Sequence, residues 1–565
     1  MSFLRGRRGG VASATTEPSE AFFRALLMPI GMVALPLVLA LLYARATTAG
    51  LARVDAMDFA QLGRNLSEGR GFVTYFLRPL ALTHGLNPVR QPELMRGPLF
   101  PFVLALFFGA RGISDAVAMQ ASGLFYLLTI PAVYTLGKRL FNPSVGRYAA
   151  LLFTVNALWL DYAVSGWHIT LCAFLVTCLF LAFHSVAKQG QTASDKPARG
   201  AWVGLGLCAG AIYLADPMSF WIIPVVLALA ARCSPEFRVR AVVTAGLAAG
   251  LFCLPWMLRN SLLGANPIFG LRAMDLWGHT TQYPESAVYR ASPTGLIPGM
   301  EMLNAAARKM LVNASLTFDT LPQVAASWML AFFLPSLLFR FRNEVTHKVR
   351  NAMMACLIAL YFGMLPMNLE MPLLASFAPT MLIFAVAYFL HLIQQAHLER
   401  PAIALAATAA GCAALFPVIR NMALTDKPLP PPGVEEAAAF ERLAGKREVV
   451  MTDAPWLVAW RGNRPAVWLP LDDADAAAIR KGFPGTRWLF LTEESRRYST
   501  NWQYVYDGFA RWNAEALEAK KQRLPMPQGI AISGTKSVLM ESLAGYESFV
   551  PPGDSAQNVI AISPK

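Results

Sequence analysis

Long apolar segments recur along most of the chain and alternate with short polar loops. Because a helix of about 20 apolar residues crosses a bilayer, the pattern predicts about eleven transmembrane helices. They are expected near 22–43, 116–137, 145–163, 168–187, 200–214, 217–231, 241–258, 322–339, 352–368, 372–394 and 402–419. The predicted fold class is therefore an all-α polytopic membrane bundle over residues 22–420.

Basic residues gather in alternate loops, which is typical of the cytoplasmic side of a membrane protein. The loops with this excess include Lys138, Arg139 and Arg147, and later Arg340, Arg342, Lys348 and Arg350. The first apolar run is longer than the apolar core of a signal peptide, about 7–15 residues, so it is interpreted as an uncleaved anchor. Residues 1–21 would then be cytoplasmic, and the outer face would carry loops 44–115 and 259–321.

The C-terminal segment has a different pattern. After the proline-rich stretch 427–433, strand-like and helix-like segments alternate: 434–444 and 473–482 favour helices, whereas 447–453, 465–470 and 486–492 favour strands. Such alternation is typical of α/β folds. We expect residues 428–565 to form a small extracytoplasmic α/β domain, located in the periplasm or outside the cell.

Composition agrees with a membrane protein rather than a nucleic-acid-binding one. The chain has 565 residues, of which 55% are hydrophobic and 15% charged, and its net charge is +14. Soluble domains carry about 25% charged residues. Since the positive charge lies in loops between apolar runs, membrane lipids are the predicted partners and nucleic acid is not. The seven cysteines suggest no disulfide framework.

Two acids follow the first apolar run. Asp55 and Asp58 are three residues apart, so on a helix they share a face. One hypothesis is an interfacial helix lying flat on the membrane, with its acids in water. The other is a catalytic site in which one carboxylate takes a proton from an attacking acceptor. A divalent metal shared by the two acids also stays open, although further ligands cannot be named.

Other candidate residues lie near the predicted outer ends of helices. Arg90 and Arg96 suit a phosphate, and equally suit lipid headgroups. Arg259 follows the interfacial Pro255-Trp256 pair. The remaining candidates, as second acid–base or acceptor-binding groups, are Asp161, His168 and Glu370.

In order along the chain, these segments resemble the GT-C class of membrane glycosyltransferases, near the protein O-mannosyltransferase and aminoarabinose transferase branch. The similarity rests on "DAMDFAQLGRNLSEGRGF" (55–72), "RGPLFPFVLALFFG" (96–109), "PWMLRNSLLGANPIFG" (255–270) and "TDAPWLVAWRGNRPAVWLP" (452–470). It implies a polyprenyl-phosphate sugar donor, with Asp55 as general base and Asp58 as helper or substitute. The arginine of the family's proline-rich motif matches Arg96.

The sequence departs from this family at two places. Relatives often have an acid where His168 stands, and an Arg-Tyr pair where this chain has "NLEMPLLASFAP" (368–379). Arg96 or Arg259 would then have to bind the donor phosphate. The resemblance implies a glycosyltransferase of the inner membrane that transfers a hexose or pentose to a protein, lipid or glycan. A non-catalytic scaffold or a transporter is the alternative.

Overall fold

The structure is a computed structural model of the whole chain. It describes residues 18–82, 87, 89–189, 199–233, 238–278, 280, 283–284, 286–291, 300–325, 327–396, 400–424, 430–471, 473–527, 546–550 and 557–563. Most of the predicted cytoplasmic N-terminus, residues 1–17, lies outside the described residues. So do 292–299 of the second outer loop and several parts of the C-terminal segment.

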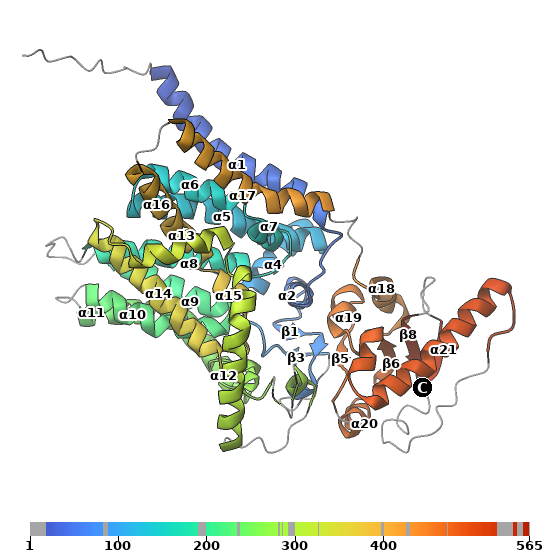
Figure 1. Ribbon diagram of the computed structural model, residues 1–565. Coiled ribbons are helices and arrows are strands. Elements are labelled where there is room, and N and C mark those ends of the chain that lie inside the picture. The colour runs from blue at the N-terminus through green and yellow to red at the C-terminus, as the bar shows by residue number, and fades with distance from the viewer. Residues whose placement is uncertain are drawn as a thin grey trace, which may run out of the picture.

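A helical bundle forms the larger part of the molecule (Figure 1). Its helices are α1 (Pro18–Thr47), α5 (Asp115–Leu140), α6 (Pro143–Thr154), α7 (Ala157–Ala163), α8 (Ile169–Gln189), α9 (Arg199–Ala215), η1 (Pro217–Trp221), α10 (Ile222–Cys233), α11 (Arg238–Leu262), α13 (Ser327–Leu338), α14 (Glu344–Met364), α15 (Met371–Ala375), α16 (Ala378–Gln395) and α17 (Arg400–Leu424). Every predicted membrane segment contains helix, which confirms the mainly helical class.

Among the described residues, four helices are both long and apolar enough to cross a membrane. They are α5, α8, α11 and α16. Other apolar helices, such as α9, are shorter, and some predicted spans are broken into two helices, as in α6 and α7. The number of eleven crossings therefore stays a prediction.

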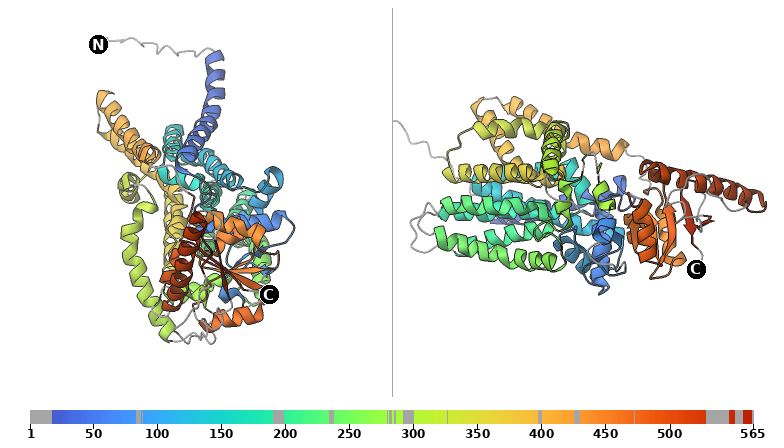
Figure 2. Two further views of the ribbon diagram at one scale, coloured as in Figure 1. Left: turned by 90° about the vertical axis from the view of Figure 1, so that its right-hand side faces the viewer. Right: turned by 90° about the horizontal axis from the view of Figure 1, so that it is seen from below.

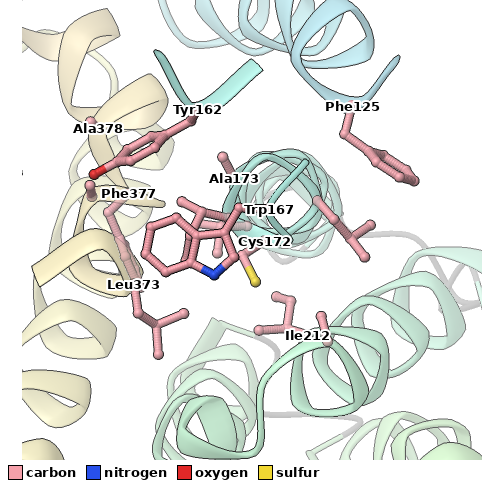
Figure 3. Close-up of a cluster of buried hydrophobic side chains, with 14 of the residues drawn as sticks. Phe125, Tyr162, Trp167, Cys172, Ala173, Ile212, Leu373, Phe377 and Ala378 are labelled. Carbon is pink, nitrogen blue, oxygen red and sulfur yellow. The ribbon is translucent and has the colours of Figure 1, made fainter. Parts of the chain in front are cut away.

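Helix α8 lies in the middle of the bundle and positions the residues just before it. Its first turns pack among Phe125 of α5, Ile212 of α9, and Leu373 and Phe377 around α15 (Figure 3). Cys172 on α8 is fully buried in this cluster. Because tightly packed cores resist local shifts, this cluster fixes the outer end of α8.

Elements of the two outer loops lie on the side of the bundle that faces the C-terminal segment (Figure 1). The first loop contains α2 (Val54–Ser67), β1 (Val73–Thr74), β2 (Phe76–Leu77), α3 (Pro79–Leu82), β3 (Gln91–Pro92) and α4 (Leu99–Arg111). The second contains η3 (Leu271–Leu276), η4 (Ala287–Arg290), α12 (Met300–Thr320) and η5 (Leu321–Gln323). These loops carry most of the charged side chains described below.

Helix α2 does not lie flat on a membrane surface. Ten consecutive residues from Ala56 to Asn65 are buried. Arg64 donates to the backbone oxygens of Ala459 and, at 2.7 Å, of Trp460 on α19 (Pro455–Arg461). The hypothesis of an interfacial helix with both acids in water is therefore wrong. Its amphipathic pattern gave no sign of this burial, because protein covers the polar face as well.

The C-terminal segment folds around a mixed sheet, seen at the right of Figure 1 and again in Figure 2. Its elements are α18 (Val434–Leu443), β4 (Val449–Thr452), α19, β5 (Ala466–Trp468), α20 (Asp473–Gly482), β6 (Thr486–Leu491), η6 (Glu493–Arg497), α21 (Thr500–Gln522), β7 (Glu547–Phe549) and β8 (Val559–Ile562). The strand order is β2-β5-β4-β6-β8-β7. The first four strands of this order pair in parallel, whereas β8 pairs antiparallel with both β6 and β7.

Alternate strand residues face opposite helix layers, as the period of two requires. Val450 and Phe490 pack with Phe440 of α18 in the main core, whereas Met451 and Leu489 pack with Trp502 of α21. This confirms the predicted strands and helices of the segment. One strand of the sheet, β2, comes from the first outer loop, which ties that loop to the C-terminal segment. The domain boundaries at 420 and 428 stay predictions.

Candidate active site

Five charged residues of the first outer loop form a continuous cluster, which we call the Asp55 network: Asp55, Asp58, Arg78, Glu93 and Arg96. Arg96 lies between the two acids: its Nε donates to Asp58 Oδ2 at 2.9 Å, and its Nη2 pairs with Asp55. Arg78 Nη2 donates to the same Asp58 oxygen at 2.7 Å, and Arg78 also faces Glu93 at 3.9 Å. The backbone N–H of Arg96 donates to Glu93 at 2.9 Å.

Exposure separates the two acids. The side chain of Asp55 is 36% exposed, whereas that of Asp58 is fully buried. Burial opposes the charge of Asp58, but the charges of Arg78 and Arg96 outweigh it and lower the pKa of this carboxyl. Asp58 therefore acts as a buried anion that holds two arginines, and Asp55 is the acid that a substrate can reach.

The pKa of Glu93 shifts in the direction opposite to that of Asp58. Burial raises the pKa of the Glu93 carboxyl, and the nearby charge of Asp58 adds to this effect although Arg78 opposes it. Glu93 caps the turn that leads into Arg96 by accepting from the backbone N–H groups of Met95 and Arg96. The turn that presents Arg96 is thus fixed by a side chain that sequence reasoning did not single out.

Gly97 allows the Arg96 turn to lie against the end of helix α9. A Cβ atom at this position would clash with the backbone oxygen of Leu214 at the end of α9. Only a residue without a side chain allows this approach, which brings the Arg96 turn against the end of α9. The residue that follows α9 is Asp216, two positions after Leu214.

A second cluster, the Asp216 network, comprises His168, Asp216, Arg272, Asp275 and Glu370. His168 Nε2 lies 3.0 Å from Asp216 Oδ2, and Arg272 Nη1 donates to Asp216 Oδ1 at 3.1 Å. Arg272 Nη2 donates to Glu370 at 2.5 Å, and its Nε faces Asp275 at 3.6 Å. Arg272 therefore has three acidic partners from three different segments.

The Asp216 network is nearly sealed from water. The side chains of Asp216 and Arg272 are 3% and 2% exposed, and only Glu370, at 22%, is reached from outside. Burial opposes ionisation of Asp216, but Arg272 and the hydrogen bond from His168 lower its pKa. Burial raises the pKa of Glu370 to about 7, because Arg272 only partly offsets burial and the charges of Asp216 and Asp55.

The two networks are neighbours. The centroids of the Phe59 ring on α2 and the His168 ring are 4.6 Å apart, and the Arg96 guanidinium carbon lies 5.3 Å from the Phe59 ring centroid. The backbone N–H of Leu271 donates to the oxygen of Leu94 at 2.9 Å, so η3 docks beside the Arg96 turn. The charges of Asp55 and Arg96 both act on Glu370.

Arg259 approaches the Asp55 network from α11. Its guanidinium lies 4.7 Å from the Trp256 ring and 5.4 Å from the Phe72 ring, and the Phe72 backbone oxygen accepts from the N–H of Glu93. Within the described residues Arg259 forms no ion pair with a carboxylate; its hydrogen bond goes to Asn260 at 3.3 Å. It is thus a half-buried cation beside an acidic cluster.

Two predicted residues lie apart from these networks. Arg90 is exposed ahead of β3 and makes no ion pair with the residues that the structure describes. Asp161 accepts a hydrogen bond from Tyr43 at 2.5 Å, and Tyr43 in turn accepts from Asn421 at 3.0 Å. Asp161 therefore joins α1, α7 and α17, and the structure does not bring it to His168.

Sequence reasoning missed Arg78, Glu93, Asp216, Arg272 and Asp275 as site residues. The Asp216-Pro217 pair by itself indicates only a tight turn between two apolar segments. A signal was available, because a charged residue directly at the end of an apolar helix needs a partner. Arg272 and Asp275 in "GLRAMDL" are three residues apart and could have been read as that partner group.

The geometry also bears on a metal. Among the described residues, no three or more His, Cys, Asp or Glu side chains gather as a metal site would require. Where the two acids of α2 could have shared a cation, Arg96 lies between them and Gln61 donates to Asp58 at 3.2 Å. In this geometry the two acids of α2 are bridged by the Arg96 guanidinium.

Known proteins resemble this chain in sequence. A family model for dolichyl-phosphate-mannose-protein mannosyltransferases matches residues 95–258. Undecaprenyl phosphate-alpha-4-amino-4-deoxy-L-arabinose arabinosyl transferase 1 of Pseudomonas fluorescens is 33% identical over 220 residues. That match covers 33% of this chain, and the chain spans 38% of the length of this curated relative.

Solved structures share the fold. ArnT from Cupriavidus metallidurans bound to undecaprenyl phosphate matches with a TM-score of 0.58 and 12% identity, over 95% of this chain and 99% of that one. The oligosaccharyltransferase AglB from Archaeoglobus fulgidus, in complex with an inhibitory peptide and a dolichol-phosphate, matches with a TM-score of 0.55 and 13% identity. That match covers 86% of this chain and 73% of AglB. The chain therefore resembles the GT-C class of membrane glycosyltransferases, as its motifs predicted, and has the fold of these two enzymes.

Proposed function

We propose that this chain is a glycosyltransferase that moves a sugar from a polyprenyl-phosphate donor to a protein, lipid or glycan acceptor. The reaction would take place at the outer face of the inner membrane. The observation that carries the proposal is Asp55, an accessible carboxylate at the edge of an otherwise buried charged cluster. Support comes from the fold shared with ArnT and AglB, whose structures hold undecaprenyl phosphate and a dolichol-phosphate.

Asp55 is the group that we assign as general base. An acceptor hydroxyl or amine would attack the anomeric carbon of the donor sugar and lose its proton to the Asp55 carboxylate. The bond from that carbon to the phosphate oxygen breaks, and polyprenyl phosphate leaves with the electron pair. Attack from the side opposite the phosphate inverts the anomeric centre. Asp58 is too deeply buried for this role.

Arg259 is the cation that we assign to the leaving phosphate. Arg96 and Arg272 are already paired with acids, whereas Arg259 forms no such ion pair within the described residues. A guanidinium can donate to two phosphate oxygens at once and offset the charge that develops as the bond breaks. Arg96 would assist where its bond to Asp55 is exchanged for a bond to phosphate.

The remaining charged residues are proposed to position the catalytic Asp55 and the arginines beside the donor phosphate. Asp58 and Glu93 hold Arg96 and Arg78 in place, so Asp55 keeps a fixed distance from the arginine beside it. Glu370, with its pKa raised to about 7 by burial, is a neighbouring acid that could hold a proton near the donor phosphate. Residues 428–565 would orient the acceptor, since their sheet takes up strand β2 of the same outer loop.

A transfer assay tests the proposal. The purified full-length chain receives a radiolabelled polyprenyl-phosphate sugar and a membrane extract as the source of acceptor. The proposal predicts that label moves to the extract, and that the same sugar on a nucleotide is not used. Donor binding without transfer from any extract would instead favour a scaffold. Absence of both binding and transfer would favour a transporter, the alternative that the shared fold does not favour.

A further inference from the structure

A polar cavity lies at the end of the bundle remote from the candidate active site. It has a volume of about 600 Å³ and lies among the ends of α5, α8 and α14. Arg139, His184, Ser185, Lys188 and Asn343 are among the residues that line it. None of these five residues belongs to the Asp55 network or the Asp216 network.

Helix α8 sets the distance between this cavity and the active site. His168, directly before α8, belongs to the Asp216 network, and Lys188 is in the last turn of the same helix. Twenty residues of α-helix rise about 30 Å, which is also the thickness of the hydrocarbon core of a bilayer. The cavity is therefore at the opposite membrane surface, where the basic loops predict the cytoplasm.

The lining favours an anion. Arg139 and Lys188 bring two positive charges, and none of the described lining residues is Asp or Glu. Arg139 also donates to the Ser185 hydroxyl at 3.5 Å, a bond that uses one of its N–H groups. The N-terminus of the 21-residue helix α14, capped by Asn343, opens onto the same space, and a helix N-terminus attracts negative charge.

A buried and unpartnered atom distinguishes this cavity from a surface with basic residues that merely anchor in lipid. His184 is 6% exposed, and its Nδ1 has no hydrogen-bond partner among the described residues. A buried polar atom without a partner is unfavourable, so a ligand that satisfies it gains affinity. Arg139 and Lys188 alone could be explained by snorkelling to the membrane surface, whereas His184 could not.

We infer that this cavity binds the phosphate group of an anionic lipid headgroup in the leaflet opposite the candidate active site. The Arg139 guanidinium, the Lys188 ammonium and the N-terminus of α14 receive the phosphate oxygens, and His184 contacts the same headgroup. The volume suits a headgroup, since ligand cavities commonly measure about 300–1,000 Å³. Arg139 and Lys188 are exposed at the rim, as expected for a site that a membrane lipid enters from the side.

Lipid titration of the full-length chain in a neutral detergent tests this inference. Thermal unfolding is followed while phosphatidylglycerol, or diacylglycerol with the same acyl chains, is added; inorganic phosphate forms a third arm. We expect phosphatidylglycerol to raise the unfolding temperature of wild type, and diacylglycerol to leave it unchanged. Lys188→Gln and Arg139→Gln should each weaken the apparent affinity about tenfold or more, because each removes a charge-assisted hydrogen bond.

Lys138→Gln is the matched control, since Lys138 is an exposed cation in the same last turn of α5 but is not among the described lining residues. It should respond to phosphatidylglycerol as wild type does. The proposed site would be overturned if diacylglycerol raised the unfolding temperature as much as phosphatidylglycerol does. It would also be overturned if Lys138→Gln and Lys188→Gln lost the same apparent affinity for phosphatidylglycerol. A response to inorganic phosphate that equals the response to the lipid would support phosphate recognition with a soluble ion as its source. Because all three cations are exposed, their replacement should not prevent folding.

Discussion

The Asp55 network and the Asp216 network use the same residue types at neighbouring places, but water reaches them differently. In the first, Asp55 is 36% exposed and Arg96 is 11% exposed. In the second, Asp216 and Arg272 are 3% and 2% exposed, and Arg272 joins three acids. The first network has an open edge where a substrate can meet a carboxylate, whereas the second is closed around its arginine.

This difference in exposure suggests a catalytic role for the Asp55 network and a stabilising role for the Asp216 network. Buried ion pairs hold segments together, and breaking one leaves an uncompensated charge in a dry environment. The Asp216 network joins the end of α8, the α9–η1 turn, η3 and the turn before α15. Substitutions in it should therefore reduce stability first, whereas Asp55→Asn should reduce activity with little loss of stability.

The largest effect on stability is expected for Arg272→Met. Methionine keeps the length and apolar stem but leaves Asp216 and Asp275 buried without a cation. Removal of one member of a buried ion network commonly costs about 3–5 kcal/mol. Thermal or denaturant unfolding of the purified chain measures this loss. Arg497→Met is the control, because the side chains of the Arg497–Glu494 pair are 79% and 63% exposed and the pair should contribute about 1 kcal/mol or less.

Arg259→Gln should have the next largest effect, on catalysis. If the Arg259 guanidinium binds the donor phosphate, its loss removes a charge-assisted interaction of about 1.5–3 kcal/mol, which is about ten- to hundredfold in donor binding or rate. Kinetics with varied donor concentration measure the change in KM and kcat. Arg259→Lys should retain part of the activity, and Arg90→Gln, at an exposed position, should retain nearly all of it. Equal losses in Arg259→Gln and Arg90→Gln would contradict the assignment.

A smaller effect is expected from Glu370→Gln, in the pH dependence of stability. Since burial raises the pKa of Glu370 from 4.5 to about 7, the folded chain binds more protons here than the unfolded chain between these two pH values. The contribution of Glu370 to stability is thus fully present below about pH 4.5 and is lost as pH rises towards 7. Glutamine does not titrate, so the unfolding temperature of the variant should decline less over this range. An unchanged slope would show that Glu370 ionises as in water.

Local patterns predicted much of the fold. The prediction of helices came from long apolar runs, and that of strands 449–452 and 486–491 from strand-like segments that alternate with helix-like ones. Both signals depend on residues that are near one another in sequence. Asp55 and Arg96 were each singled out by family motifs, and the structure places them in contact. Local order and motif spacing were therefore sufficient for these features.

Long-range contacts account for what was missed. Part of the burial of α2 comes from α19, which is about 400 residues further along the chain, and the amphipathic pattern of α2 cannot show this. The segment "NLEMP" has no arginine of its own. Arg272 of η3, 98 positions earlier in the chain, contacts Glu370 of this segment instead. Pairing of this kind depends on the packing of the bundle and not on the spacing of a motif.

The most direct test of the central claim compares Asp55→Asn with Asp58→Asn and Glu68→Gln in three measurements: unfolding, donor binding and sugar transfer. We predict that Asp55→Asn folds and binds donor but loses transfer by about 10²–10⁴-fold, the usual contribution of a general base. Asp58→Asn should be destabilised, because Arg78 and Arg96 lose their shared buried anion. Glu68→Gln should resemble wild type. Transfer by Asp55→Asn at the wild-type rate would contradict the account.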